Sequence, residues 1–400
     1  ILVGFYLENS NPEFFFSSDS YSYIEPAKEI CESGKFNDVN KNPEITRTPG
    51  VSIFLLPSVC YDLNIINYIF LLNLIMILLA AYFSCKILKL VNIKISSVFV
   101  FLVFLIDPTL SKHQFNILSD IIFLFWFTLT LYFLFYGLKN NNFLYFFFGF
   151  VLITLDTFIR PITLYLPHYL LIFFMLFYSL NSSFRVKFKY PLILATVLGL
   201  VFHLALTQLW TYRNYQATGI KEFTYIKVLN NYLYKTAGII AKNQKRDFLD
   251  VHIEFKNNVK NFSKNEFISF SNNEIKKAII NHPFETIMVG IEGAIMTLFT
   301  PGTGQYLRMF KISDKNYEIS KNILRGLGLI WVIIMGSFAL YGIIKIDKNI
   351  FFLIGVLIFA YLLLASSGPM SYSRFRIPFM PLLIILIACL IFSNLNADQI

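Results

Sequence analysis

Long apolar segments, separated by short polar stretches, run through most of the chain. A helix needs about 20 predominantly apolar residues to cross a membrane. Segments that meet or approach this length are Ile65–Leu90, Ile95–Ile106, Ile117–Leu138, Phe143–Ile159, Ile162–Leu180, Pro191–Trp210, Ile323–Ile344, Ile350–Leu364 and Ile377–Phe392. The predicted fold class is therefore all-α, a polytopic bundle of transmembrane helices. Thr286–Phe299 is apolar but short, which fits an interfacial or re-entrant helix as well as a span.

The same pattern divides the chain into regions. They are the tail of a truncated first transmembrane helix (1–7), a first outer loop (8–64), a transmembrane bundle (65–210), a late outer loop or lid that contains 286–299 (211–322), C-terminal transmembrane helices (323–394) and a tail (395–400). The first of these is inferred because Ile1–Leu7 is apolar and does not begin with Met.

Both outer loops contain signals for short helices. Tyr21–Ser33 is predicted to be a helix lying against the membrane, ended by Gly34 in a left-handed conformation. In the late loop, Ser271-Asn-Asn-Glu274 has the spacing of a capping box. It predicts a helix through Ile275–Asn281 that ends before Pro283, because a residue that precedes proline avoids the helical conformation.

Composition supports a membrane protein. Hydrophobic residues make up 56% of the 400 residues and charged residues only 14%, against about 25% charged in a typical soluble domain. This balance excludes a disordered chain, a coiled coil and a secreted disulfide scaffold. The net charge of +10 could indicate nucleic-acid binding. No nucleic-acid partner is expected, however, because the lysines lie between apolar segments, as in cytoplasmic loops.

The lysine-rich short loops set the predicted orientation. The basic residues assigned to the cytoplasmic side are Lys86, Lys89, Lys94, Lys139, Arg185, Lys187, Lys189, Lys345 and Lys348. The large loops then lie outside, provided that Thr286–Phe299 does not cross the membrane. Cys31 and Cys60 both fall on the outer side, where a disulfide between them is one of the alternatives.

Charged residues at the predicted outer borders are the candidate functional groups, because ionisable groups near the bilayer are costly and often functional. The five arginines there are Arg47, Arg160, Arg213, Arg374 and Arg376. Arginine holds phosphate through a planar fork of N–H donors, which favours a shared anionic site over independent contacts with lipid headgroups. The five histidines are scattered and are interpreted as interface or surface residues.

Carboxylates mark the same borders. Asp19 is the best candidate for a catalytic base, although an acid at the start of a helix is often only an N-cap. Asp156 is expected to pair with Arg160 across one helical turn. Further candidates for lining the site are Tyr21, Tyr23, Asp107, Asp120 and Arg160. No phosphate-binding loop, nucleophile elbow or zinc-binding helix motif is present in the sequence.

Several of these segments follow one another in the order seen in a known family. They are Ser18-Asp19-Ser-Tyr-Ser-Tyr-Ile-Glu-Pro-Ala27, Gly34-Lys-Phe36, Arg47-Thr-Pro-Gly50, Leu118-Ser-Asp120, Ile159-Arg-Pro161, Trp210-Thr-Tyr-Arg-Asn214 with Gly219, His282-Pro283 and Arg374-Phe-Arg-Ile-Pro378. The chain thus resembles the GT-C glycosyltransferases, and among them the protein O-mannosyltransferase-like and aminoarabinose transferase-like group.

The resemblance implies transfer of a sugar from a polyprenyl-phosphate carrier to a lipid, glycan or protein acceptor, on the outer face of the plasma membrane. It implies that Asp19 is the catalytic base and Arg47 the donor-phosphate ligand. Arg213, Arg374 and Arg376 are secondary candidates for binding the donor phosphate, because they lie at the same predicted outer border. Many members carry Asp-Glu in the first loop, whereas Ser20 follows Asp19 here. No metal site and no cofactor are therefore expected, and membrane lipids are the remaining partners.

Two other functions fit parts of the pattern. A surface-polysaccharide ligase or polymerase would also span the membrane and carry outer arginines, but with its catalytic residues in a large late loop. A lipid-linked sugar flippase or transporter would carry charged residues near the bilayer midplane and an internal repeat.

Overall fold

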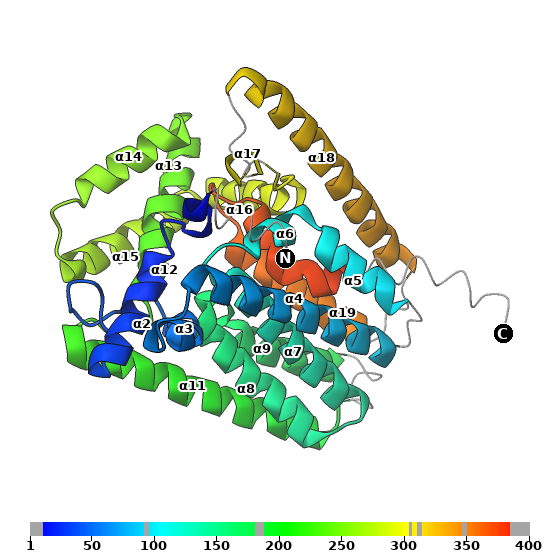
Figure 1. Cartoon of the computed structure of the whole chain (residues 1–400). Coiled ribbons are helices and arrows are strands. Elements are labelled where there is room, and N and C mark those ends of the chain that lie inside the picture. The colour runs from blue at the N-terminus through cyan, green and yellow to red at the C-terminus, as the bar shows by residue number, and fades with distance from the viewer. Residues whose placement is uncertain are drawn as a thin grey trace.

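The computed structural model describes residues 11–91, 96–180, 188–303, 306–309, 314–345 and 350–384. Within these ranges every named element is helical, and the only β pairing is an isolated bridge between Asn37 and Pro43 (Figure 1). The predictions for residues 1–7 and 395–400, and those for Lys94, Arg185, Lys187 and Lys348, lie outside the described residues.

Five described helical segments are long and apolar enough to cross a membrane, which confirms the all-α membrane fold. They are α4 (Ile65–Leu90), α7 (Asp120–Lys139), the continuous stretch of η2 (Pro161–Thr163) and α9 (Leu166–Leu180), α11 (Tyr190–Thr218) and the Tyr317–Ser337 part of α18 (Asp314–Lys345). Shorter apolar helices are α3 (Gly50–Cys60), α5 (Ser97–Ile106), α8 (Phe143–Ile159) and the Phe351–Ser366 part of α19 (Ile350–Ser366).

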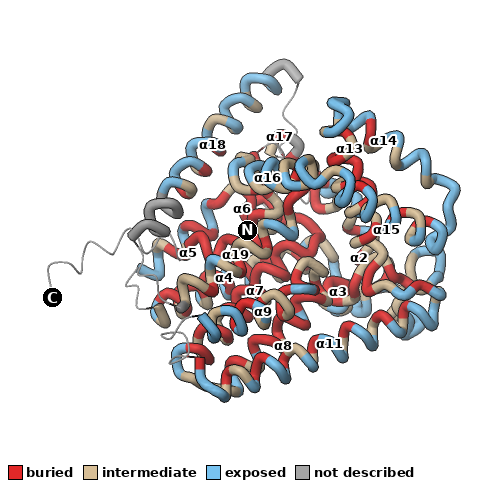
Figure 2. Tube along the Cα trace, turned by 180° about the vertical axis from the view of Figure 1, so that it is seen from behind, coloured by how far each residue is buried: buried red, intermediate tan, exposed pale blue. Residues whose placement is uncertain are grey.

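Helix α7 forms the centre of the bundle. In its most apolar stretch 72% of the residues are buried, compared with 11–39% in the other four long segments. It packs between α4 and α8 and also contacts η4 (Ser373–Phe379). Buried residues accordingly concentrate along α7, while α11 and α18 lie at the periphery with exposed outer faces (Figure 2). A helix that is apolar on all sides is expected at such a position.

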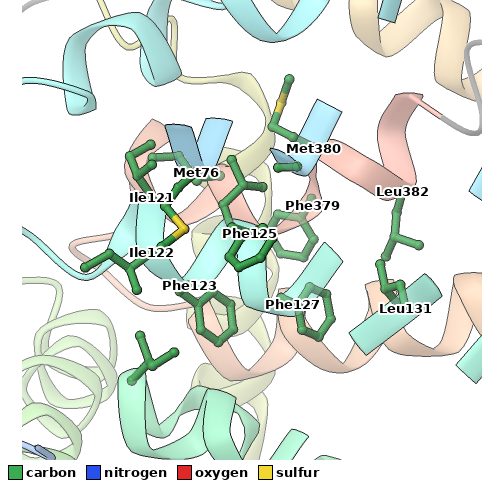
Figure 3. Packing of buried hydrophobic residues seen from close by; sticks show 14 of the residues in the cluster. Met76, Ile121, Ile122, Phe123, Phe125, Phe127, Leu131, Phe379, Met380 and Leu382 are labelled. Carbon is green, nitrogen blue, oxygen red and sulfur yellow. The ribbon is translucent and has the colours of Figure 1, made fainter. Parts of the chain in front are cut away.

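Aromatic side chains fill the contact between α7 and its neighbours. Phe123 and Phe127, one turn apart on α7, stack with ring centroids 5.5 Å apart. Met76 of α4 and Phe379 of η4 lie against the same part of α7 (Figure 3). All of these side chains are at least 90% buried. This packing fixes the start of α7 relative to η4, although the two are more than 250 residues apart.

The first loop is attached to the beginning of α7. It contains η1 (Pro12–Phe15) and α2 (Tyr21–Ser33), and Gly34 ends α2 with φ of 70°, as predicted. The Ser20 hydroxyl donates to the Ile117 carbonyl oxygen at 2.9 Å. Cys31 and Cys60 form a disulfide, which joins the C-terminal ends of α2 and α3.

Helix α3 begins in close contact with the end of α8. A Cβ atom on Gly50 would lie 2.6 Å from the Phe158 carbonyl oxygen, so only glycine permits this approach. Because Arg47 precedes α3 and Arg160 follows α8, the contact brings both arginines to one end of the bundle. At the opposite end, the Lys139 ammonium of α7 donates to the Leu90 carbonyl oxygen of α4.

The late loop is a succession of helices, of which α16 packs against α19 and η4 (Figure 1). They are α12 (Tyr225–Asn230), the π-helical η3 (Asn231–Thr236), α13 (Ala237–Gln244), α14 (Phe248–Asn258), α15 (Lys264–Asn281) and α16 (Pro283–Phe299). Helix α16 includes the apolar segment Thr286–Phe299, for which the sequence leaves open whether it crosses the membrane. It is not among the five segments that are long and apolar enough to do so.

The prediction of a capping box at Ser271-Asn-Asn-Glu274 is wrong, although the predicted end of the helix at Asn281 is correct. The box that forms is Ser263 with Glu266, eight residues earlier, and it opens the longer helix α15. Ser271 lies inside that helix and is fully buried. The Ser-x-x-Glu pattern occurs twice in succession here, and the first copy begins the helix because Lys264–Phe270 also takes the helical conformation.

Candidate active site

Asp19 lies just before α2, where its side chain does not cap the helix. Ser20 occupies the N-cap position, and no side-chain capping bond is formed there. Instead, Asp19 Oδ1 accepts from Arg47 Nη2 at 2.7 Å, and Oδ2 accepts from Arg374 Nη1 at 3.4 Å. The side chain is 33% exposed. The carboxylate is therefore held between two guanidinium groups and still reaches open space.

The loop between α2 and α3 positions Arg47. The Glu44 carboxylate accepts from the backbone N–H groups of Thr46 and Arg47, which fixes the turn. Arg47 Nε donates to the Ser22 hydroxyl at 3.0 Å, and the guanidinium lies 5.1 Å from the centre of the Tyr23 ring. Part of this arginine's hydrogen-bonding capacity is thus used to orient it toward Asp19.

A second carboxylate, Asp120, begins α7 and is completely buried. It accepts from Arg160 Nη1 at 2.6 Å and from Arg374 Nε at 2.8 Å. Arg160 also lies over the Phe375 ring, with 5.5 Å to the ring centre. Two hydrogen-bonded guanidinium groups compensate the cost of burying this charge.

The prediction that Asp156 pairs with Arg160 is wrong. Asp156 is buried and accepts from the Thr130 hydroxyl at 2.8 Å. Arg160 ends α8 with extended backbone, at φ −147° and ψ 115°, so it no longer follows the helical spacing on which the prediction depends. Its side chain contacts the start of α7 instead.

Arg374 connects the two carboxylates. Its N–H groups reach Asp19 and Asp120, so a continuous chain of alternating charges runs through Arg47, Asp19, Arg374, Asp120 and Arg160. Burial alone would lower the pKa of Arg374, but the Asp120 carboxylate, together with Tyr372 and Tyr23, holds that pKa above its ordinary value. We call these five residues the charge cluster. With three arginines and two carboxylates, it carries one excess positive charge.

A cavity of about 340 Å³ opens beside the charge cluster. Its lining residues are Phe14, Phe16, Ser17, Ser18, Asp19, His113, Asn116, Leu118, Tyr372 and Arg374. Asp19 and Arg374 thus connect the cluster to a space that a small polar molecule could occupy. His113, which the sequence places among interface or surface residues, is 2% exposed and lines this cavity.

The structure does not bring Arg213 and Arg376 into the charge cluster. Arg213 donates to the backbone carbonyl oxygens of Glu44 and Phe36, at 2.7 and 2.8 Å. Arg376 donates to the carbonyl oxygens of Leu298 and Thr300, at 2.8 and 3.0 Å. These bonds hold both arginines against the backbone of other segments, away from the charge cluster.

Asp107 and Tyr21 also lie apart from the charge cluster. Asp107 caps α6 (Pro108–His113) through its bonds to the Thr109 and Leu110 N–H groups, and it accepts from Trp331 Nε1 at 3.0 Å. Tyr21 is 58% exposed and stacks on Phe16 at the cavity wall, with ring centroids 5.7 Å apart.

No group of three histidine, cysteine, aspartate or glutamate side chains in the described part of the chain is placed to hold a metal ion. Comparison with protein-family models, curated proteins and solved structures finds no match to this chain. We therefore infer the function from the geometry of the charge cluster and its cavity.

Proposed function

We propose that the protein is a membrane glycosyltransferase of the GT-C type. It transfers a sugar from a polyprenyl-phosphate carrier to a lipid, glycan or protein acceptor. The observation that carries this proposal is the position of Asp19, a partly exposed carboxylate at a cavity wall between two arginines. A base and an anion-binding group are thus adjacent at one end of an apolar helical bundle.

The proposed reaction is a single displacement at the anomeric carbon. Asp19 accepts the proton of the acceptor hydroxyl, whose oxygen forms the new glycosidic bond as the bond to the lipid phosphate breaks. The departing phosphate takes both electrons of that bond, and Arg47 and Arg374 stabilise its charge. One carboxylate cannot serve as both nucleophile and acid, so inversion of the anomeric configuration is expected, by analogy with glycosidases.

The surrounding fold suits a lipid-linked substrate. A polyprenyl tail requires an apolar environment, which the exposed apolar faces of the long helices share with the lipid. The phosphate requires cations, and the excess positive charge of the charge cluster is located where these helices end. We assign this end to the outer face of the plasma membrane, because lysine-rich loops are usually cytoplasmic and the lysine-rich loops belong to the other end.

Arg47→Ala should weaken binding of a polyprenyl-phosphate sugar about 10- to 100-fold, because hydrogen bonds to charged groups contribute about 1.5–3 kcal/mol each. Arg47→Lys should recover only part of the affinity, since lysine lacks the planar fork. The measurement is a donor titration with purified protein in lipid nanodiscs.

The matched control is Arg246→Ala. Arg246 is a 44% exposed arginine of the late loop, and its ion pair with Glu254 lies at the surface. Its replacement should leave donor affinity unchanged. Donor affinity that is equal in Arg47→Ala, Arg246→Ala and the wild type would reject Arg47 as the phosphate ligand.

A further inference from the structure

His113 lies at the cavity wall. It is the last residue of α6, whose first turn is capped by Asp107 and whose Thr109 hydroxyl accepts from Arg376 Nη2 at 3.1 Å. The imidazole is 2% exposed, and neither of its ring nitrogens has a hydrogen-bond partner within the described residues. A buried polar group without a partner destabilises the folded state, so folding alone does not explain this side chain.

The surroundings of His113 favour its neutral form. Burial, followed by the positive charge of Lys112, lowers its pKa well below the ordinary value of 6.5. Asp120 acts in the opposite direction, whereas Arg374 and Arg160 add to the lowering. A neutral imidazole has one N–H donor and one nitrogen acceptor. This pair matches a hydroxyl group, which both donates and accepts, better than it matches a phosphate, which only accepts.

The rest of the cavity wall also suits a carbohydrate. Phe14 and Phe16 provide aromatic surface, and Ser17, Ser18 and Asn116 provide small polar groups. Ligand sites generally combine apolar walls with a few well-placed polar groups. Asp19 and Arg374 line the same space, so a ring that occupies it would lie next to both the base and a phosphate-stabilising group.

We propose that His113 hydrogen-bonds a hydroxyl of the sugar that is transferred and thereby contributes to sugar selection. The inference rests on the proposed function, because in a single displacement the anomeric carbon of the transferred sugar lies between the acceptor oxygen, which the base deprotonates, and the leaving phosphate. His113 is thus a specificity residue for the sugar ring, while Arg47 and Arg374 bind the phosphate.

The test compares lipids of equal charge that differ only in the sugar. The probes are polyprenyl methyl phosphate and the glucose, galactose, mannose and arabinose conjugates of polyprenyl phosphate, titrated against protein in nanodiscs. At least one conjugate should bind the wild type more tightly than the methyl phosphate. His113→Phe should reduce that advantage about 3- to 10-fold, the value of one ordinary hydrogen bond, without changing affinity for the methyl phosphate. His113→Gln, which keeps a donor and an acceptor, should retain part of it.

His168→Phe is the matched control. Among the described residues its Nδ1 is also buried without a partner, but His168 lies on α9 beside His203 and is not among the residues that line the cavity. The His168→Phe variant should keep the full difference in affinity between the sugar conjugates and the methyl phosphate. If His113→Phe is not folded by thermal melting, His113→Gln and His113→Ala are compared in the same way.

Three results would overturn the inference in distinguishable ways. An undiminished sugar advantage in the folded His113 variants would reject it and leave the proposed function intact. An equal loss of affinity for every probe, the methyl phosphate included, would show that His113 acts on the phosphate or the fold. A wild type that binds no conjugate better than the methyl phosphate would contradict both the inference and the proposed function.

Discussion

Asp19→Asn is expected to lower turnover about 100- to 10,000-fold, the usual contribution of a general base. The amide can still accept a hydrogen bond from Arg47 through its oxygen, so the local fold should persist. It cannot take up the proton of the acceptor hydroxyl. Turnover measured with a polyprenyl-phosphate sugar, together with donor affinity, separates a missing base from a missing binding site.

Asp38→Asn is the control for this variant. Asp38 lies in the same first loop, and one of its carboxylate oxygens accepts from the Asn40 and Asn42 N–H groups, a role that an amide oxygen can fill. The control should retain wild-type turnover. If Asp19→Asn also remained within about threefold of the wild type, Asp19 would have only a structural role, contrary to the general-base contribution expected of it.

Asp120→Asn is expected to destabilise the folded protein by about 3–5 kcal/mol, because it leaves the buried guanidinium groups of Arg160 and Arg374 without their shared carboxylate. Removing a second charge with Arg160→Gln should recover part of the loss. The free energy of unfolding in detergent micelles is the quantity to measure.

Asp156→Asn supplies the comparison, since Asp156 is equally buried but its only side-chain partner in the described residues is the neutral Thr130 hydroxyl. An amide oxygen can still accept that bond, so its replacement should cost much less. An equal cost for the two variants would mean that the pairing of Asp120 with arginine does not stabilise the start of α7.

The helices were predictable where a local signal determines them. Uninterrupted apolar runs gave α4 and α8 their observed bounds, and Gly34 marked the end of α2. Local signals failed where two similar patterns compete, as with the capping box that forms at Ser263 instead of Ser271. Whether Cys31 pairs with Cys60 could not be decided from the sequence, because the pairing depends on how α2 and α3 pack.

The partners of the charged residues were harder to predict than the helices. Border position identified Asp19, Arg47, Asp120, Arg160 and Arg374, which the structure brings together. The same criterion selected Arg213, whose partners are backbone carbonyl groups far away in the chain. Every residue has a backbone carbonyl group, so the sequence does not show which of these groups an arginine binds. For this reason nothing distinguished Arg213 from Arg374.

His113 shows the opposite failure. A single histidine in a short polar segment is usually a surface residue, and only the folded chain shows that this one is buried at the cavity wall. A weak signal was present: His113 lies in a short segment between two apolar runs and precedes Asp120 by seven residues. Because α6 packs against η4, the helix that ends at His113 lies beside the charge cluster.

In the proposed reaction, the residues of the charge cluster promote cleavage of the bond between a sugar and a polyprenyl phosphate. The most direct measurement incubates purified protein in nanodiscs with the panel of polyprenyl-phosphate sugars and a membrane-lipid extract as acceptor, and follows release of free polyprenyl phosphate. We expect release from at least one donor by the wild type, inversion at the anomeric carbon and almost no release by Asp19→Asn. Equal release by the wild type and Asp19→Asn, or donors that bind but remain intact, would contradict the proposed reaction.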